Sequence, residues 1–159
     1  MKLTSVCIAL FFILSSVLFS QPDEEIEKIK EAAPNVASVK PKKKRHILVY
    51  SKPSGFKHNS IPTGVKGLRV LAEKTQAFEA TFTLETNEFT SEGLKKYDAI
   101  IFNNTTHVQK AFTENSQRDA ILDFIKNGKA FIGFHAASDG GMSQWQEYTD
   151  MIGGCFAGH

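Results

Sequence analysis

The feature that most constrains the fold is a series of short apolar runs that alternate with stretches of helical periodicity. Three runs are almost continuously apolar, as is typical of strands buried on both faces of a sheet; they cover residues 46–50, 99–102 and 130–134. The second strand in chain order, 78–84, alternates apolar and polar residues, which predicts one wetter face. Helical spacing follows Pro62 and Thr113, and Gly128 is placed to end the second of these helices.

Strands that alternate with helices in this way form right-handed parallel βαβ units. We therefore predict an α/β domain with a doubly wound parallel sheet, flavodoxin-like in its strand order, 2-1-3-4. Ligands of such sheets bind beyond the carboxyl ends of the strands. The residues that directly follow each strand are therefore the first candidates for a functional site.

Residues 1–20 have the pattern of a secretory signal peptide. Lys2 precedes an apolar run from Val6 to Phe19, which is shorter than the ~20 apolar residues of a membrane-spanning helix. We expect cleavage after Ser20 and a secreted or periplasmic protein without a stable membrane anchor. An uncleaved anchor is the alternative.

Residues 21–45 differ in composition from the rest of the chain. Acidic residues give way to the basic run that ends at Arg45, three prolines are interspersed, and few residues are large and apolar. One or two helical turns fit within 24–33, but we expect a linker or disordered arm. The basic run resembles a nuclear-localisation or heparin-binding pattern. The 19 basic and 17 acidic residues of the whole chain are too balanced for a nucleic-acid partner.

Histidines are the main candidates for chemistry. His46 is expected at the surface and His107 in a solvated loop. His58, His135 and His159 each lie beside glycine or aromatic residues, and we predict that they converge at the carboxyl edge of the sheet. Three imidazoles and the Asp139 carboxylate are suitable ligands for zinc or another divalent metal, although their spacing matches no compact metal motif. Alternatively, a histidine acts as general acid or base without any metal. The cofactor is left open.

Two further patterns bear on the chemistry. The turn after the fourth strand carries His135 where hydrolases place a nucleophile, and Cys155, far along the chain, is expected to be a small buried hydrophobe. Catalysis by a serine or cysteine nucleophile is therefore not favoured. The run Asn103 to Thr106 contains two overlapping glycosylation sequons, but it is better interpreted as a source of ligand contacts.

Four separated blocks then resemble one family. They are G-F-K-H-N-S-I-P at 55–62, F-N-N-T-T at 102–106, G-F-H-A-A-S-D at 133–139, and W-x-x-Y with I-G-G-C-F-A-G-H up to residue 159. Together they resemble the trehalose-utilisation, ThuA-like family over residues 46–159. The resemblance implies a fold similar to class I glutamine amidotransferases without their cysteine, and a link to sugar metabolism. The motif positions are His58, Asn104, Thr105, His135, Asp139, Trp145, Tyr148 and His159.

The resulting expectation is a secreted ThuA-like domain that acts on or binds a carbohydrate or sugar derivative, and that is not a glutamine amidotransferase. The alternative is a non-catalytic carbohydrate-binding or scaffolding module. The oligomeric state is left open. The expected roles are catalysis for His135 and Asp139, substrate binding for Asn104, Thr105, Trp145 and Tyr148, and metal binding for His58, His135 and His159.

We also expect residues 46–159 to be the N-terminal part of a larger α/β domain. Flavodoxin-like sheets usually have a fifth strand, and only four are predicted here. The family pattern also continues beyond the glycine–histidine pair at which this sequence stops. The fourth strand, 130–134, is then expected at an edge that is open to pairing.

Overall fold

The structure is a computed structural model that describes residues 23–140 and 144–158. The predicted signal peptide lies outside these residues. Within the described part of the chain, no helix has the length and apolarity needed to cross a membrane. The elements in chain order are α1 (Glu24–Ala32), β1 (Arg45–Tyr50), α2 (Ser60–Thr75), β2 (Phe78–Thr83), α3 (Ser91–Leu94), β3 (Ala99–Asn103), α4 (Val108–Ala111), α5 (Asn115–Lys126), β4 (Ala130–Phe134), the 3₁₀ turn η1 (His135–Ser138) and α6 (Gln146–Ile152).

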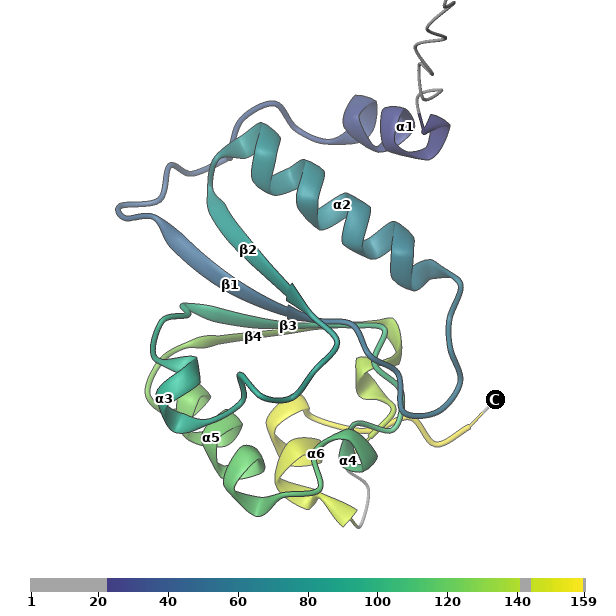
Figure 1. Ribbon diagram of the computed structural model, residues 1–159, viewed down its shortest axis with the longest axis vertical. Coiled ribbons are helices and arrows are strands. Elements are labelled where there is room, and N and C mark those ends of the chain that lie inside the picture. Colours follow the sequence, from purple (N-terminus) through teal and green to yellow (C-terminus); the bar gives the residue numbers. More distant parts are fainter. Residues whose placement is uncertain (1–22, 141–143, 159) are drawn as a thin grey trace, which may run out of the picture.

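The four strands form one sheet in the order β2-β1-β3-β4, and every neighbouring pair is parallel. Helix α2 covers one face of the sheet, and α3, α5 and α6 lie on the other (Figure 1). The predicted α/β fold and strand order are therefore confirmed. All four carboxyl ends meet at one edge, which lies to the right in Figure 1.

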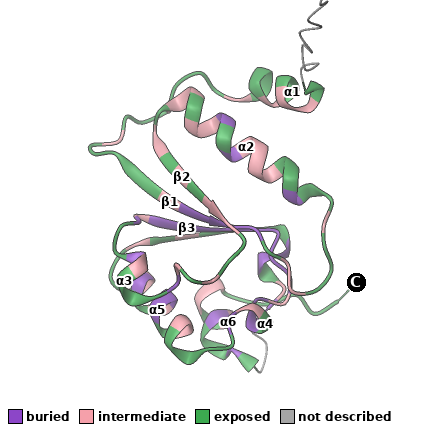
Figure 2. Ribbon diagram, in the orientation of Figure 1, coloured by how far each residue is buried: buried purple, intermediate pink, exposed green. Residues whose placement is uncertain are grey.

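Burial follows the apolar patterns of the strands. All five residues of β3 are buried, as are the last three of β1, whereas β2 has no fully buried residue (Figure 2). This agrees with the continuous apolar runs of the two central strands and with the alternation in β2. The predicted strand boundaries are correct to within one residue.

The larger part of the core lies between the sheet and α3, α5 and α6. The rings of Tyr50, Phe89, Phe102 and Phe112 have their centroids 4.9 to 5.9 Å apart, mostly in tilted or edge-to-face arrangements. Aromatic rings favour such geometries because of their quadrupoles. The α2 face has a smaller cluster, which is centred on Leu68.

Helix ends agree closely with the sequence signals. The Thr90 hydroxyl accepts a hydrogen bond from Gly93 N at 3.0 Å and caps α3. Helix α5 begins one residue later than a Thr113 cap predicts, because Glu114 occupies the N-cap position. Gly128 follows the helix with φ 83°, a left-handed conformation that suits glycine.

Helix α1 lies in the segment where we expected a linker or disordered arm. The side chain of Asp23 caps the helix, and Lys66 of α2 binds both Asp23 and Glu25 at 2.5 and 2.6 Å. Lys74 donates to Ala33 O at 2.7 Å. No α1 residue is buried, so polar contacts hold this helix on α2. Docking of this kind leaves no trace in the apolar content of a segment.

Strand β4 is the outer strand of the sheet, as expected for the fourth apolar run. Four of its five residues are exposed, and the Ile132 and Phe134 side chains are each 40% exposed. Phe131 points to the opposite face and packs against the aromatic core. The continuous apolar pattern thus does not mean complete burial at this position.

Asp98 organises the amino edge of the sheet. Its carboxylate accepts from His46 N at 3.1 Å and lies 2.9 Å from Lys43 Nζ and 3.3 Å from Arg45 Nη1. The Lys43 ammonium, followed by the His46 amide, holds the pKa of Asp98 far below its ordinary value of 3.8.

We expect Asp98→Asn to lower the free energy of unfolding at pH 7 by about 1 to 3 kcal/mol, since it removes charged hydrogen bonds from a mostly buried group. A carboxyl group whose pKa is lower in the folded than in the unfolded state stabilises the fold at pH values above its unfolded pKa. This stabilisation is lost as the pH falls through the folded pKa. The difference between wild type and variant should therefore shrink below about pH 4. Urea unfolding at several pH values measures this, and Asp119→Asn on the exposed side of α5 is the control.

Candidate functional site

Three loops converge at the carboxyl edge of the sheet. Residues 51–59 follow β1 and carry His58, residues 104–107 follow β3 and end at His107, and η1 begins with His135 directly after β4. Parallel pairing places these loops side by side, because each follows the carboxyl end of a neighbouring strand.

His58 and His135 face each other across two of these loops. Their ring centroids lie 4.6 Å apart at an interplanar angle of 71°. The predicted convergence is confirmed for this pair, whereas His159 lies outside the described residues. Among the described residues, no group of three or more histidine, cysteine, aspartate or glutamate side chains is arranged to hold a metal ion. The metal site at His58, His135 and His159 therefore stays a prediction.

Backbone strain is concentrated at this edge. His135, His107 and Asn104 have φ values of 47°, 49° and 55°, and the only other positive-φ residue besides glycine in the described chain is Gln76 at the end of α2. A left-handed conformation is costly for a residue with a Cβ, and such strain tends to occur at functional sites. It therefore draws attention to the loops after β3 and β4.

Asp139 and His107 form a second pair next to the histidines. His107 Nδ1 lies 3.6 Å from Asp139 Oδ1, and the Asp139 side chain is 20% exposed. The His107 ring packs over Gly55 so closely that a Cβ atom at residue 55 would lie only 2.1 Å from its Cδ2 atom. His107 is thus half-buried against the loop after β1, which differs from the solvated position expected from its sequence.

Asn104 ties the loop of His58 to β3. Its amide nitrogen donates to Asn103 Oδ1 at 2.9 Å, and its Oδ1 accepts from Ser60 Oγ at 3.3 Å. Asn103 in turn donates to Ile61 O at 3.1 Å. The amide is buried and bound within the protein, and the expected contact of Asn104 with substrate stays a prediction. Its contacts position the start of α2.

Thr105 is equally withdrawn from the surface, at 1% exposure. Its hydroxyl has no hydrogen-bond partner among the described residues. The expected contact of Thr105 with substrate also stays a prediction. Burial of both asparagines also argues against glycosylation of the folded chain at either sequon.

Trp145 and Tyr148 belong to the core rather than to the site. They are 2% and 0% exposed, and their rings pack together 5.0 Å apart. The Tyr148 hydroxyl donates to Ala137 O at 2.7 Å, and burial raises the pKa of Tyr148 above its ordinary value. This burial argues against the expected stacking of the two rings on a sugar, which stays a prediction. The indole instead supports the α4–α5 region, where Arg118 lies over it at 5.2 Å.

A cavity of about 520 Å³ opens next to the histidine pair. Its volume falls in the range of small-molecule sites. Two exposed aromatic residues that sequence reasoning missed, Phe56 and Phe156, contribute to its wall. The lining residues are Phe56, His58, Thr106, His135, Ala136, Ser138, Asp139 and Phe156.

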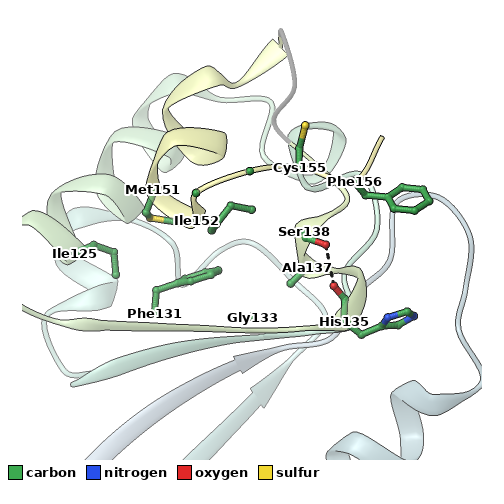
Figure 3. A pocket seen from close by; sticks show the side chains of 12 residues that line it. Ile125, Phe131, Gly133, His135, Ala137, Ser138, Met151, Ile152, Cys155 and Phe156 are labelled. Atoms are coloured by element: carbon green, nitrogen blue, oxygen red, sulfur yellow. Dashed lines mark hydrogen bonds between the residues drawn. The ribbon is translucent and has the colours of Figure 1, made fainter. Parts of the chain in front are cut away.

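A second cavity, of about 720 Å³, lies between β4, η1 and the end of α6 (Figure 3). His135, Ser138 and Phe156 line both cavities, and the rest of this wall is largely apolar. Cys155 also lines the second cavity and is exposed. Its expected role as a buried hydrophobe is therefore wrong, because the two glycines before it lead the chain back over the surface.

The strain at His135 predicts an unusual ranking of variants. His135→Gly should be more stable than His135→Ala by about 1 kcal/mol, since only glycine adopts positive φ without a steric cost. Both variants lose the imidazole, so the comparison isolates the backbone. Urea unfolding measures the difference, and an alanine variant as stable as the glycine variant would contradict the left-handed conformation.

Burial of Trp145 predicts a structural rather than a binding defect. Trp145→Ala should lower the free energy of unfolding by about 3 to 5 kcal/mol, because it leaves a large cavity in the aromatic core. Thermal and urea unfolding measure the loss. A small change in stability together with a specific loss of ligand binding would show that the ring is accessible after all.

Comparison with known proteins adds family evidence to this geometry. A crystal structure at 2.30 Å of a ThuA-like protein from Bacteroides uniformis ATCC 8492 is similar in fold, with a TM-score of 0.56 and 22% identity. The match covers 77% of this chain and 45% of that protein, so the chain spans less than half of its length. None of the curated proteins compared with the chain matches it. The ThuA family model, described as trehalose utilisation, matches residues 46–159, and the chain therefore belongs to the ThuA family.

Proposed function

We propose that this ThuA domain binds a sugar or sugar derivative in the cavity of about 520 Å³, and that His135 acts there as general acid or base. The family suggests a role related to carbohydrate. The pair of His58 and His135, 4.6 Å apart at the cavity wall, is the observation that carries the proposal.

The arrangement supports this chemistry in two ways. His135 is exposed and lines the cavity, so its imidazole has access to a bound hydroxyl or carbonyl group. Histidine exchanges protons efficiently near neutral pH. The left-handed backbone conformation of His135 fixes the direction in which its Cα–Cβ bond leaves the chain. Preorganisation of this kind favours proton transfer.

Asp139 is proposed as the second polar group of the site. Its carboxylate lines the same cavity and lies next to His107. A carboxylate accepts hydrogen bonds from sugar hydroxyls. Asp139 thus offers a substrate contact or a second catalytic group in the same cavity wall as His135.

The competing function is a non-catalytic sugar-binding module. The position directly after β4, where hydrolases place a serine or cysteine nucleophile, is occupied by His135, and this favours the non-catalytic module. Metal assistance through His58, His135 and His159 is a further proposal. Export of the protein is proposed from the basic and apolar pattern of residues 1–20 alone.

The test is sugar binding and turnover by single histidine variants. We expect His135→Ala to abolish turnover of a susceptible sugar, and His58→Ala to weaken binding about tenfold, the effect of one lost polar contact. Saturation-transfer NMR with a panel of pyranose sugars including trehalose measures binding, and product analysis by NMR measures turnover. Metal content of each variant is determined on the same samples.

His46→Ala is the matched control, since this histidine is partly exposed at the opposite, amino edge of the sheet. It should leave binding and turnover unchanged. Binding without turnover in the wild type would favour the non-catalytic module. Failure of every sugar to bind the wild type would overturn the proposed function.

A further inference from the structure

We propose that Phe56 and Phe156 form an aromatic platform that binds the apolar C–H face of a pyranose ring. This inference rests on the proposed function and specifies its ligand as a cyclic sugar rather than an open-chain sugar or polyol. It assigns to these two exposed residues the stacking role that the sequence suggested for Trp145 and Tyr148, whose rings are buried.

Both rings are exposed at the same cavity. Phe56 is 72% exposed and Phe156 is 42% exposed, and both line the cavity of about 520 Å³ that contains His58 and His135. Figure 3 shows the Phe156 and His135 side chains extending to the same side of η1, away from Met151. Covering such apolar area with a ligand is favourable, at ~25 cal/mol per Å².

The backbone that carries Phe56 is fixed at the site. The Thr106 hydroxyl accepts from Gly55 N at 3.0 Å and donates to Phe56 O at 3.0 Å. The Phe56 ring also meets His58 edge to face, with centroids 4.9 Å apart. The loop after β1 is thereby tied to the loop after β3, and the backbone from which the Phe56 ring extends is fixed beside the cavity.

Phe156 is tethered in a comparable way. Its backbone N–H donates to Ser138 O at 2.9 Å, which ties the segment after α6 to the η1 turn. Ser138 in turn donates through its hydroxyl to His135 O at 3.1 Å. The backbone of Phe156 is therefore tied to the same turn that carries the proposed acid or base.

The mixture of groups indicates the ligand class. Two phenyl rings offer apolar faces, while His58, His135 and Asp139 offer polar contacts within the same wall. A matching ligand is a rigid ring with an apolar face and a polar rim. A pyranose with equatorial hydroxyls has this form, since its axial C–H bonds make one face apolar and its hydroxyls surround the edge. An open-chain polyol has the hydroxyls without the face.

The experiment compares ring-bearing and acyclic probes on the full chain. Methyl β-D-glucopyranoside and trehalose are the pyranose probes, and sorbitol is the acyclic one. We expect Phe56→Ala and Phe156→Ala each to weaken pyranose binding about five- to tenfold by NMR titration, the loss expected for one ring contact. Phe56→Trp should retain binding. Sorbitol should bind the wild type at least tenfold more weakly than either pyranose.

Leu84→Ala is the matched control, since Leu84 is a 56% exposed apolar residue in the loop after β2 that does not line this cavity. It should bind the pyranose probes as the wild type does. Pyranose binding that is unchanged in both phenylalanine variants, or equal affinity for sorbitol, would overturn the platform and leave the proposed function intact. No binding of any sugar to the wild type would overturn both.

Discussion

The parallel pairing of β1 with β3, and of β3 with β4, is the constraint on which the site depends. The register aligns Tyr50 with Phe102, and Asn103 with Phe134, so the three strands end almost level. Whatever follows these residues therefore meets at one edge. A shift of β4 by two residues along β3 would move His135 by ~6.6 Å, since a strand rises ~3.3 Å per residue. Backbone hydrogen bonds within the sheet thus set where the loops that carry the two histidines begin.

The aromatic residues fall into two groups, buried rings that stabilise the core and exposed rings beside a cavity. Those between the sheet and α5, including Phe102, Phe112 and Trp145, lose nearly all contact with water and supply cohesion. Phe56 and Phe156 remain exposed beside a cavity. Composition alone does not separate the two, because phenylalanine is abundant throughout the chain. The separation depends on whether a ring lies on a covered sheet face or on a loop beyond the strand ends.

The sequence was sufficient to predict the sheet, its strand order and the meeting of His58 with His135, because these follow from hydrophobic periodicity and parallel topology. The sequence was not sufficient to predict which side chains point into the core and which point to the surface. The interval of three between Trp145 and Tyr148 equally fits a buried helix face and a binding surface, and the structure selects burial. The contact of His107 with Asp139 joins residues after different strands, and the docking of α1 depends on charge pairs across 41 to 43 positions. Neither contact produces a local sequence pattern from which it could be predicted.

The outer position of β4 has a consequence for how its backbone exchanges hydrogen with solvent. Ala130 N donates to Asp98 O, and Phe134 O accepts from Asn104 N, so alternate residues of the strand are bonded to β3. The amides of Phe131 and Gly133 point to the other side, because successive residues of a strand face opposite neighbours. The amide protons of Ala130 and Ile132, which face β3, are therefore expected to exchange slowly, and those of Phe131 and Gly133 to exchange fast. A molecule that adds a strand along this edge would slow the exchange of the outward-facing amides. The exchange rate of the Gly133 amide therefore reports directly on pairing at this edge.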